Sequence, residues 1–196
     1  GKNIVPLDLV LNRDKSILLI SGPNAGGKSV CLKTVGLLQY MLQWGLLIST
    51  AESSELRLFK DIFIDIGDNQ SIENDLSTYS SHLLNMKNIL DEAGEDSLVL
   101  IDEFGSGTEP AAGGAIAEEI LSELEKRGCY GVITTHYTNL KLYAGNSQRV
   151  VNGAMLFDVQ KIEPLFKLEM GLPGNSFAFE LARKMGLPEN IVHGAE

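Results

Sequence analysis

A chain of 196 residues is long enough for one domain with a sizeable core and too short for two generous ones. Lys and Arg number 16 against 26 Asp and Glu, a net charge of −10, which excludes a general polyanion binder because nucleic-acid affinity depends on basic residues that displace counterions. No apolar run could cross a bilayer and no export leader opens the chain, so we expect a cytoplasmic protein without a membrane partner.

The two cysteines, Cys31 and Cys129, lie far apart in the sequence, each within an apolar stretch. Neither has Cys or His neighbours at the spacing that zinc sites require. We therefore predict two buried, reduced thiols.

The first part of the chain predicts a strand, a glycine-rich loop and a helix. Residues 1–11 read as a strand, and the apolar run SILLIS at 16–21 is typical of a buried parallel strand. Apolar residues then recur at helical spacing from Lys28 to about Trp44, and Gly45 is placed to end that helix.

The rest of the chain alternates strands and helices. Strands alternating with helices at this spacing predict an α/β fold, a mostly parallel sheet with helices on both faces, and ligands then bind at the carboxyl ends of the strands. The expected elements are strand-like residues 56–66, a polar loop at 67–76, a helix at 79–93, a buried strand at 97–101, a helix at 112–127, a buried strand at 130–134, antiparallel strands within 150–170 and two short helices from 175, broken at 186–188.

Residues 22–29, GPNAGGKS, fit the phosphate-loop pattern G-x-x-x-x-G-K-[ST] between a buried strand and an amphipathic helix. Glycines let backbone N–H groups crowd around phosphates, and the helix N-terminus adds positive potential. Lys28 is predicted to reach the β- and γ-phosphates of ATP, and the Ser29 hydroxyl to bind Mg²⁺. The alternative is a plain glycine turn. The predicted nucleotide-binding residues here are Gly22, Pro23, Asn24, Ala25, Gly26, Gly27, Lys28, Ser29 and Val30.

Two carboxylates follow the strand at 97–101. Asp102 is placed to hold Mg²⁺ directly or through water. Glu103, beside it, can orient and deprotonate the water that attacks the γ-phosphate, which favours hydrolysis over binding alone. The alternative is a solvated acidic pair that opens a loop.

Three further positions are candidates for the same cleft. His136 ends the strand at 130–134, where its imidazole could donate to the γ-phosphate or position the water. Gln70, in the polar loop, is a candidate contact for the magnesium or its water. Ser77 and Thr78 begin a helix, either as simple caps or as part of a helix start aimed at a phosphate on another subunit.

Four motifs, GPNAGGKS, LSTYSSH, LIDEFGSGTEP and TTHY, occur in the order and at the spacing of MutS ATPase domains. The chain resembles that family, within the ABC class of P-loop NTPases, over essentially its whole length. Its tail, GLPGNSFAFELARKMGLPENIV, is similar to the helical dimerisation element that closes the family's domain. The resemblance implies an ATPase domain at 1–174 and the start of a helix-turn-helix dimerisation element at 175–196, in a fragment of a larger protein.

The resemblance also implies roles at the matching positions. Asp102 and Glu103 match the magnesium and hydrolysis carboxylates, and His136 matches the switch histidine. Ser77 and Thr78 match the signature residues that reach across a homodimer to the partner's γ-phosphate.

Three further positions carry roles by the same resemblance. Asn24 matches a phosphate or water contact, and residues 105–109 match the loop that connects the two sites. Ile4 and Pro6 lie where the family packs the adenine, but an aromatic residue is commoner at the first position, so we expect weaker stacking.

Departures from the mismatch-repair motifs GPNMGGKST and STFMVEM narrow the resemblance. Here Ala25 replaces Met, Val30 replaces Thr, and Ser80-Ser81-His82 replaces Met-Val-Glu. These differences resemble the second bacterial MutS branch, which lacks the mismatch-reading domain and often carries a C-terminal Smr nuclease domain. That branch is associated with branched DNA, suppression of recombination and, in some bacteria, stalled ribosomes.

The leading hypothesis is therefore a Mg-dependent ATPase whose two copies enclose ATP and drive a clamp on DNA or a ribosome through regions outside this chain. Any endonuclease activity would belong to an Smr domain that the chain lacks. The alternatives are a mismatch-repair MutS domain, a nucleotide-gated module with negligible turnover, and another ABC-class protein. A small-molecule kinase is a further alternative, but it would need a basic lid for its second substrate, and this acidic chain offers no obvious one.

Overall fold

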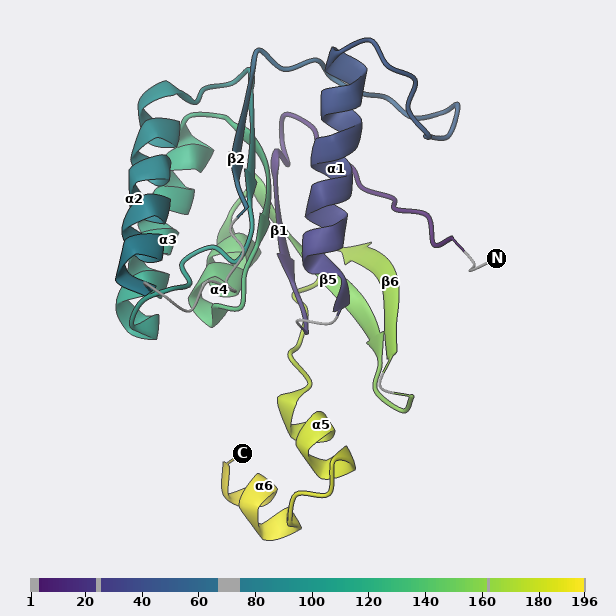
Figure 1. The fold of residues 1–196 in the computed structure, drawn as a ribbon, viewed down its shortest axis with the longest axis vertical. Helices are drawn as coiled ribbons and strands as arrows, with labels where there is room; N and C mark the ends of the chain where they lie inside the picture. The colour runs from purple at the N-terminus through teal and green to yellow at the C-terminus, as the bar shows by residue number, and fades with distance from the viewer. Residues whose placement is uncertain (1–3, 24–25, 67–74, 162, 196) are drawn as a thin grey trace.

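The computed structural model describes residues 4–23, 26–66, 75–161 and 163–195 and places six strands in one sheet (Figure 1). Their order is β2-β3-β4-β1-β5-β6, in which the first five strands are parallel and β6 is antiparallel to β5. The strands are β1 (Ile17–Ser21), β2 (Asp61–Asp65), β3 (Ser97–Ile101), β4 (Tyr130–Thr134), β5 (Val150–Asp158) and β6 (Glu163–Met170).

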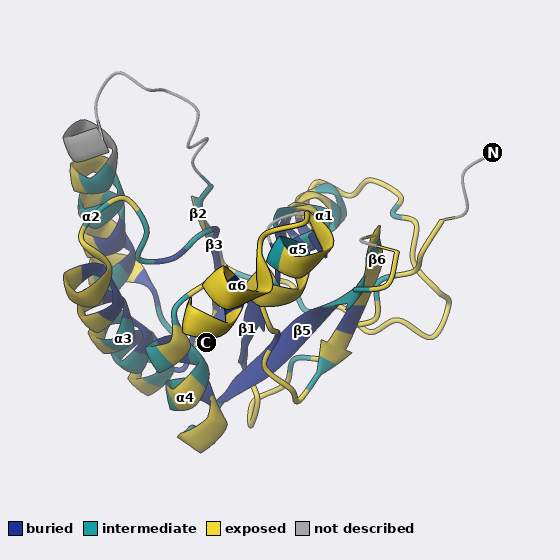
Figure 2. Ribbon diagram, turned by 90° about the horizontal axis from the view of Figure 1, so that it is seen from below, coloured by how far each residue is buried: buried dark blue, intermediate teal, exposed yellow. Residues whose placement is uncertain are grey.

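Helices cover both faces of this sheet, which confirms the predicted α/β fold (Figures 1 and 2). Successive residues of β1 point to opposite faces, so Ile17 and Leu19 enter one core while Leu18 and Ile20 enter the other. The first core also contains α2, α3 and α4, and the second contains α1. The helices are α1 (Lys28–Gln43), α2 (Asp75–Glu92), α3 (Pro110–Lys126), α4 (Thr138–Asn146), α5 (Ala178–Lys184) and α6 (Glu189–Ala195).

The predicted N-terminal strand is wrong for the residues that the structure describes. Residues 4–11 form no strand, although alternate residues Leu7, Leu9 and Leu11 pack against the second core. The apolar alternation therefore reflects one-sided packing of an extended segment, without the backbone ladder that defines a strand. Likewise, only Asp61–Asp65 of the strand-like stretch 56–66 pairs with the sheet.

Helix α4 has no counterpart among the predicted elements. It is only nine residues long, and just Leu140 and Ala144 are buried, so its apolar periodicity is too short to stand out.

Both cysteines are buried and free, as predicted. Burial raises the pKa of Cys31 to about 11, so its thiol stays protonated at neutral pH. No helix in the described ranges is long and apolar enough to cross a bilayer.

The last two helices stand apart from the sheet, below the carboxyl ends of its strands in the view of Figure 1. They confirm the two short helices expected in the tail. Phe177, just before α5, stacks on Phe157 of β5 with ring centroids 6.0 Å apart. This contact attaches the helical tail to the end of the β5–β6 pair.

Candidate functional site

The three loops expected to carry chemistry follow β1, β3 and β4, which are neighbours in the sheet. Ile20 pairs with Thr134, and Ile101 pairs with Ile133, so the three strands end at one edge. Two backbone hydrogen bonds extend this pairing into the loops: Thr135 N–H donates to the Ile20 carbonyl (3.0 Å) and Phe104 N–H to the Thr134 carbonyl (2.9 Å). The loops thus start from fixed positions.

The glycine-rich loop joins β1 to α1 through conformations that favour glycine. Gly22 (φ 135°) and Gly27 (φ 92°) both have positive φ, and Gly27 lies directly before the first residue of α1. Gly26 N–H donates to the Pro23 carbonyl (2.9 Å), which closes a turn. The loop therefore needs glycine for its shape.

Lys28 is the first residue of α1, and its side chain is almost fully buried. Its ammonium donates to the carbonyl oxygens of Gly22 (2.9 Å) and Pro23 (3.1 Å). Burial lowers the pKa of Lys28, while the charges of Glu103 and Asp102 oppose that shift. The ammonium is therefore within electrostatic range of both carboxylates.

Asp102 and Glu103 are held by a residue that the sequence analysis did not single out. Thr134, fully buried at the end of β4, donates its hydroxyl hydrogen to Asp102 Oδ1 and accepts the Glu103 N–H at 2.8 Å. Glu103 has a left-handed backbone (φ 51°), which turns the chain sharply after the buried Asp102. Thr134 therefore fixes the orientation of one carboxylate and the backbone of the other.

His136 lies two residues beyond β4 with an exposed side chain. Although His136 is exposed overall, desolvation of the part of its ring that faces the protein, together with the Lys28 charge, lowers its pKa, so a neutral imidazole is favoured at pH 7. A neutral ring can donate one hydrogen bond and accept another. The residue after it, Tyr137, donates its hydroxyl to the Gly105 carbonyl (3.0 Å) and so holds the loop that follows Glu103.

The remaining predicted residues divide into three groups. Asn24, Ala25 and Gln70 lie outside the described residues. Ser29 and Val30 occupy the first turn of α1, and Ile4 and Pro6 lie in the exposed N-terminal segment. Ser77 and Thr78 lie in the first turn of the described part of α2, Asp75–Glu92.

Phe166 of β6 is an aromatic neighbour of the glycine-rich loop that the sequence analysis missed. It has a left-handed backbone (φ 52°), and a Cβ placed on Gly27 would lie 2.8 Å from Phe166 Cδ1. The residue is 47% exposed, and its ring packs on the loop through Cδ1. No short motif marks Phe166, because its position depends on β6 folding back along β5.

Gly174 is a second residue that was missed. Its N–H donates to Ser21 Oγ at 2.7 Å, and an added Cβ would lie only 2.4 Å from the Ser21 carbonyl oxygen. The Lys141 ammonium of α4 donates to the Gly174 carbonyl (3.2 Å). The segment after β6 therefore packs tightly against the start of the glycine-rich loop.

The oxygen donors at this edge fit magnesium. Mg²⁺ is usually bound by one or two protein oxygens, with waters and substrate phosphates completing its octahedron. Asp102 supplies a carboxylate that Thr134 orients, and Ser29 supplies a hydroxyl in the first turn of α1. Within the described ranges, no cluster of three His, Cys, Asp or Glu side chains could hold a metal ion.

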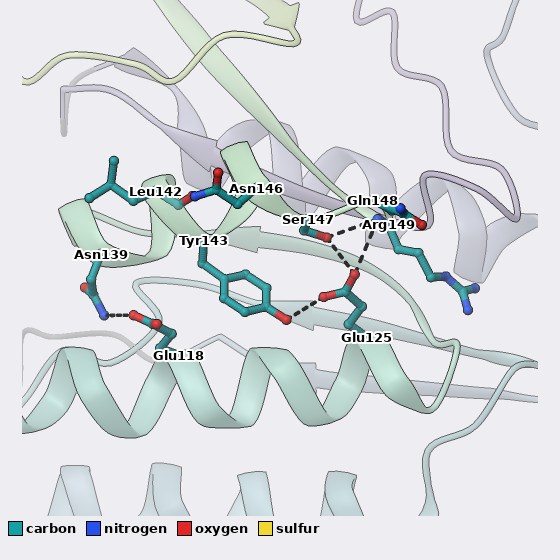
Figure 3. Close-up of a pocket in the computed structure, with 9 residues that line it drawn as sticks. All are labelled: Glu118, Glu125, Asn139, Leu142, Tyr143, Asn146, Ser147, Gln148 and Arg149. Carbon is teal, nitrogen blue, oxygen red and sulfur yellow. Dashed lines mark hydrogen bonds between the residues drawn. The ribbon is translucent and has the colours of Figure 1, made fainter.

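Two cavities differ in their relation to these residues. One of about 30 Å³, room for a water by volume, lies between α2, α3 and the ends of β2 and β3, and Asp102 and Glu103 line it. A larger pocket of about 700 Å³ runs between α3 and α4 and contains none of the predicted site residues (Figure 3).

Several polar side chains of the larger pocket bond to one another. Glu118 accepts from Asn139, and Glu125 accepts from Tyr143 and Ser147 (Figure 3). These bonds tie α4, the helix that follows His136, to α3. The pocket therefore has a structural explanation and supplies no group to the carboxyl edge.

The model of the family described as MutS domain V matches residues 18–196. This chain belongs to the MutS domain V family. The match includes β1 from Leu18 onward, the other five strands and every loop of the carboxyl edge.

Similar proteins support the resemblance of this chain to the second MutS branch. The chain is 50% identical over 194 residues to a protein of Bacillus cytotoxicus named Endonuclease MutS2, covering 99% of this chain and 25% of that protein. It is 49% identical to the protein of the same name from Clostridium kluyveri (99% and 25%) and 50% identical to that from Geobacillus thermodenitrificans (98% and 24%). The resemblance to the MutS2 type is thus confirmed, and the chain spans about a quarter of the length of these relatives.

Proposed function

We propose that this chain is an ABC-class P-loop ATPase module that binds Mg-ATP, and that two copies enclose the nucleotide to drive a MutS-type clamp on nucleic acid. One observation carries the proposal: the buried Lys28 ammonium and the Asp102–Glu103 pair, oriented by Thr134, lie at one edge of the sheet. Phosphoryl transfer needs little more from a protein than positioning and charge stabilisation.

Each of these residues has a task in that reaction. Lys28 binds the β- and γ-phosphate oxygens and stabilises their charge. Ser29 and Asp102 hold the magnesium, which neutralises charge on the phosphates when bound. Glu103 accepts the proton of the attacking water, and neutral His136 donates a hydrogen bond that orients that water or the γ-phosphate.

The base has a candidate site beside the loop. Phe166 packs against Gly27 and is itself 47% exposed, so we propose that its ring contacts the adenine. Ile4 and Pro6, in the exposed N-terminal segment, would pack on the other side of the base. Phe166 supplies the aromatic surface that Ile4 cannot.

The second copy completes the site. α2 begins at Asp75 and carries Ser77 and Thr78 in its first turn, where free backbone N–H groups and the helix dipole favour a phosphate. If these residues contact the partner's γ-phosphate, ATP favours the dimer and ADP relaxes it.

The nucleic-acid role rests on kinship. The relatives carry the name Endonuclease MutS2, which supports a nucleic-acid substrate for the whole protein. From the resemblance to this branch we propose a clamp on branched or mismatched DNA that suppresses recombination, with a ribosome as the other expected partner. DNA binding and any endonuclease activity belong to regions outside this chain, whose net charge of −10 disfavours direct contact with a polyanion.

Phosphate release tests the reaction. Wild type should hydrolyse ATP in the presence of Mg²⁺, Glu103→Gln should bind ATP but lose turnover, and Lys28→Ala should lose nucleotide affinity. Glu103→Gln with ATP should also sediment as a dimer more than the apo or ADP-bound forms. Negligible turnover in wild type, no higher than in Glu103→Ala, would instead favour a binding module. No gain in dimer would count against the composite site.

A further inference from the structure

Two side chains of helix α2 contact the carboxylate of Asp65, the last residue of β2. Its Oδ2 lies 2.7 Å from His82 Nδ1, and its Oδ1 accepts from Asn85 Nδ2 at 3.0 Å. Asn85 also donates to the Ile64 carbonyl (3.1 Å), so two residues of α2 bind the end of β2. The side chains of Asp65 and His82 are only 12% and 22% exposed, which protects the contact from solvent.

This contact lies next to the proposed catalytic carboxylates. The Asp65 carbonyl accepts the Asp102 N–H at 2.9 Å, so the residue that α2 grips is also bonded to the backbone of the proposed magnesium ligand. Asp65, His82, Asp102 and Glu103 line the same small cavity. On the other side, a Cβ on Gly107 would lie 3.6 Å from Tyr79 Cβ, which places α2 against the loop after Glu103.

We propose that Asp65 and His82 are positioning residues that set the first turns of α2 relative to Asp102 and Glu103. The inference rests on the proposed function, in which Ser77 and Thr78 of α2 act on the partner's γ-phosphate. His82 follows Thr78 by four residues, about one helical turn, so a shift at His82 moves the signature residues. The Asp65–His82 pair thereby connects Asp102 and Glu103, which act on the chain's own nucleotide, to the α2 residues that contact the partner's nucleotide.

The residue types favour this reading over chance packing. The mismatch-repair motif STFMVEM has Glu at the position of His82, and a glutamate there would face Asp65 with a second negative charge. Here the hydrogen bond and the charge of Asp65 raise the pKa of His82, so the two groups attract one another. The Asp65–His82 contact therefore depends on the same stretch of sequence that separates this chain from the mismatch-repair motif.

Mixed dimers of the full polypeptide test the proposal. His82→Ala keeps the glycine-rich loop and should bind ATP within about twofold of wild type, but lose about ten- to a hundredfold in kcat through misplacement of α2. Lys28→Ala loses nucleotide binding at its own glycine-rich loop but keeps α2 intact. Mixing the two should restore turnover to about a quarter of wild type, because half of randomly paired chains form mixed dimers with one complete site.

Two controls separate this inference from the proposed function. Ser77→Ala mixed with Lys28→Ala must also recover turnover; failure of that pair would overturn the composite site itself. Lys87→Ala, which breaks an exposed pair with Asp91 on the same helix, should leave turnover unchanged.

The outcome is then decisive for His82. If the Ser77 mixture recovers and the His82 mixture does not, or if His82→Ala alone loses ATP affinity, the contact serves its own nucleotide site and the proposal is wrong. Should His82→Ala fail to fold, Asp65→Asn is mixed in the same way, and His82→Asn, which keeps a donor near the Nδ1 position, should retain most of the turnover.

Discussion

Two regions that adjoin Asp102 and Glu103 are held in place differently. In the first, β1, β3 and β4 are fully buried and carry their backbone hydrogen bonds into the loops that follow them. In the second, the side chains of His82 and Asn85 hold α2 to the end of β2, a strand that is only partly buried. Backbone hydrogen bonds between strands fix the positions of the loops, whereas a few side-chain bonds leave α2 more freedom to move.

The largest effect is expected from loss of the Thr134 hydroxyl, which holds both Asp102 and the backbone of Glu103. Thr134→Val leaves Asp102 and the Glu103 N–H without their buried partner, so turnover should fall about a hundredfold. The free energy of unfolding should fall by about 1–3 kcal/mol. Phosphate release and urea denaturation measure the two effects, and Thr134→Ser, which restores the hydroxyl, should recover most of both. Equal losses in the Ser and Val variants would contradict this role.

The next effect concerns the segment that packs on the glycine-rich loop. Gly174→Ala should destabilise the fold by about 1–3 kcal/mol, because the new methyl group would overlap the backbone of Ser21 and Gly22. Gly94→Ala is the matched control, since a Cβ there meets nothing within 4 Å. Urea denaturation compares the variants, and similar midpoints for both would show that the 171–177 segment moves without cost.

A smaller, selective effect is expected at the base. Phe166→Ala should raise the Kd for ATP about tenfold and leave kcat nearly unchanged, as expected for the loss of one stacking contact. Phe179→Ala, on α5 with 41% exposure against 47% for Phe166, is the control. Titration with a fluorescent ATP analogue gives both affinities. A drop in kcat alone would place Phe166 with the phosphates instead.

The smallest effect concerns the pH dependence of the contact between α2 and β2. Asp65 raises the pKa of His82, so the stabilisation from this pair is present below the unfolded-state pKa of His82 and is lost as pH rises through its folded-state pKa. The difference in unfolding free energy between wild type and His82→Ala should therefore shrink, by about 1 kcal/mol or less, from pH 6 to pH 9. Thermal unfolding across that range measures it. A difference that grows with pH would show that the histidine acts as a neutral partner.

The sequence predicted best what local patterns determine. The apolar runs at 16–21, 97–101 and 130–134 all became buried strands, and parallel strands must end together, so Lys28, Asp102 and His136 could be assigned to one edge. Their chemical roles remain predictions. The strand predicted at the N-terminus was wrong for residues 4–11, because a paired strand and an extended segment packed on one side have the same apolar alternation.

The rest depends on contacts between distant parts of the chain. Thr134 reads as the end of an apolar strand, and only the pairing of β3 with β4 brings its hydroxyl to Asp102. Phe166 and Gly174 reach the glycine-rich loop because β6 folds back along β5. His82 was noted as a departure from a motif, but its partner Asp65 lies 17 residues away across a polar loop, beyond the reach of helical or strand periodicity.

The bond between Gly174 and Ser21 joins residues 153 positions apart, and β1 itself lies between β4 and β5, which are made much later. As a ribosome releases the chain from its N-terminus, β1 and its loop emerge early but their neighbours emerge late. Non-local pairings of this kind slow folding. The proposed nucleotide pocket is therefore among the last parts of the domain to mature, and on the proposed function ATP binding would report that synthesis has passed residue 174.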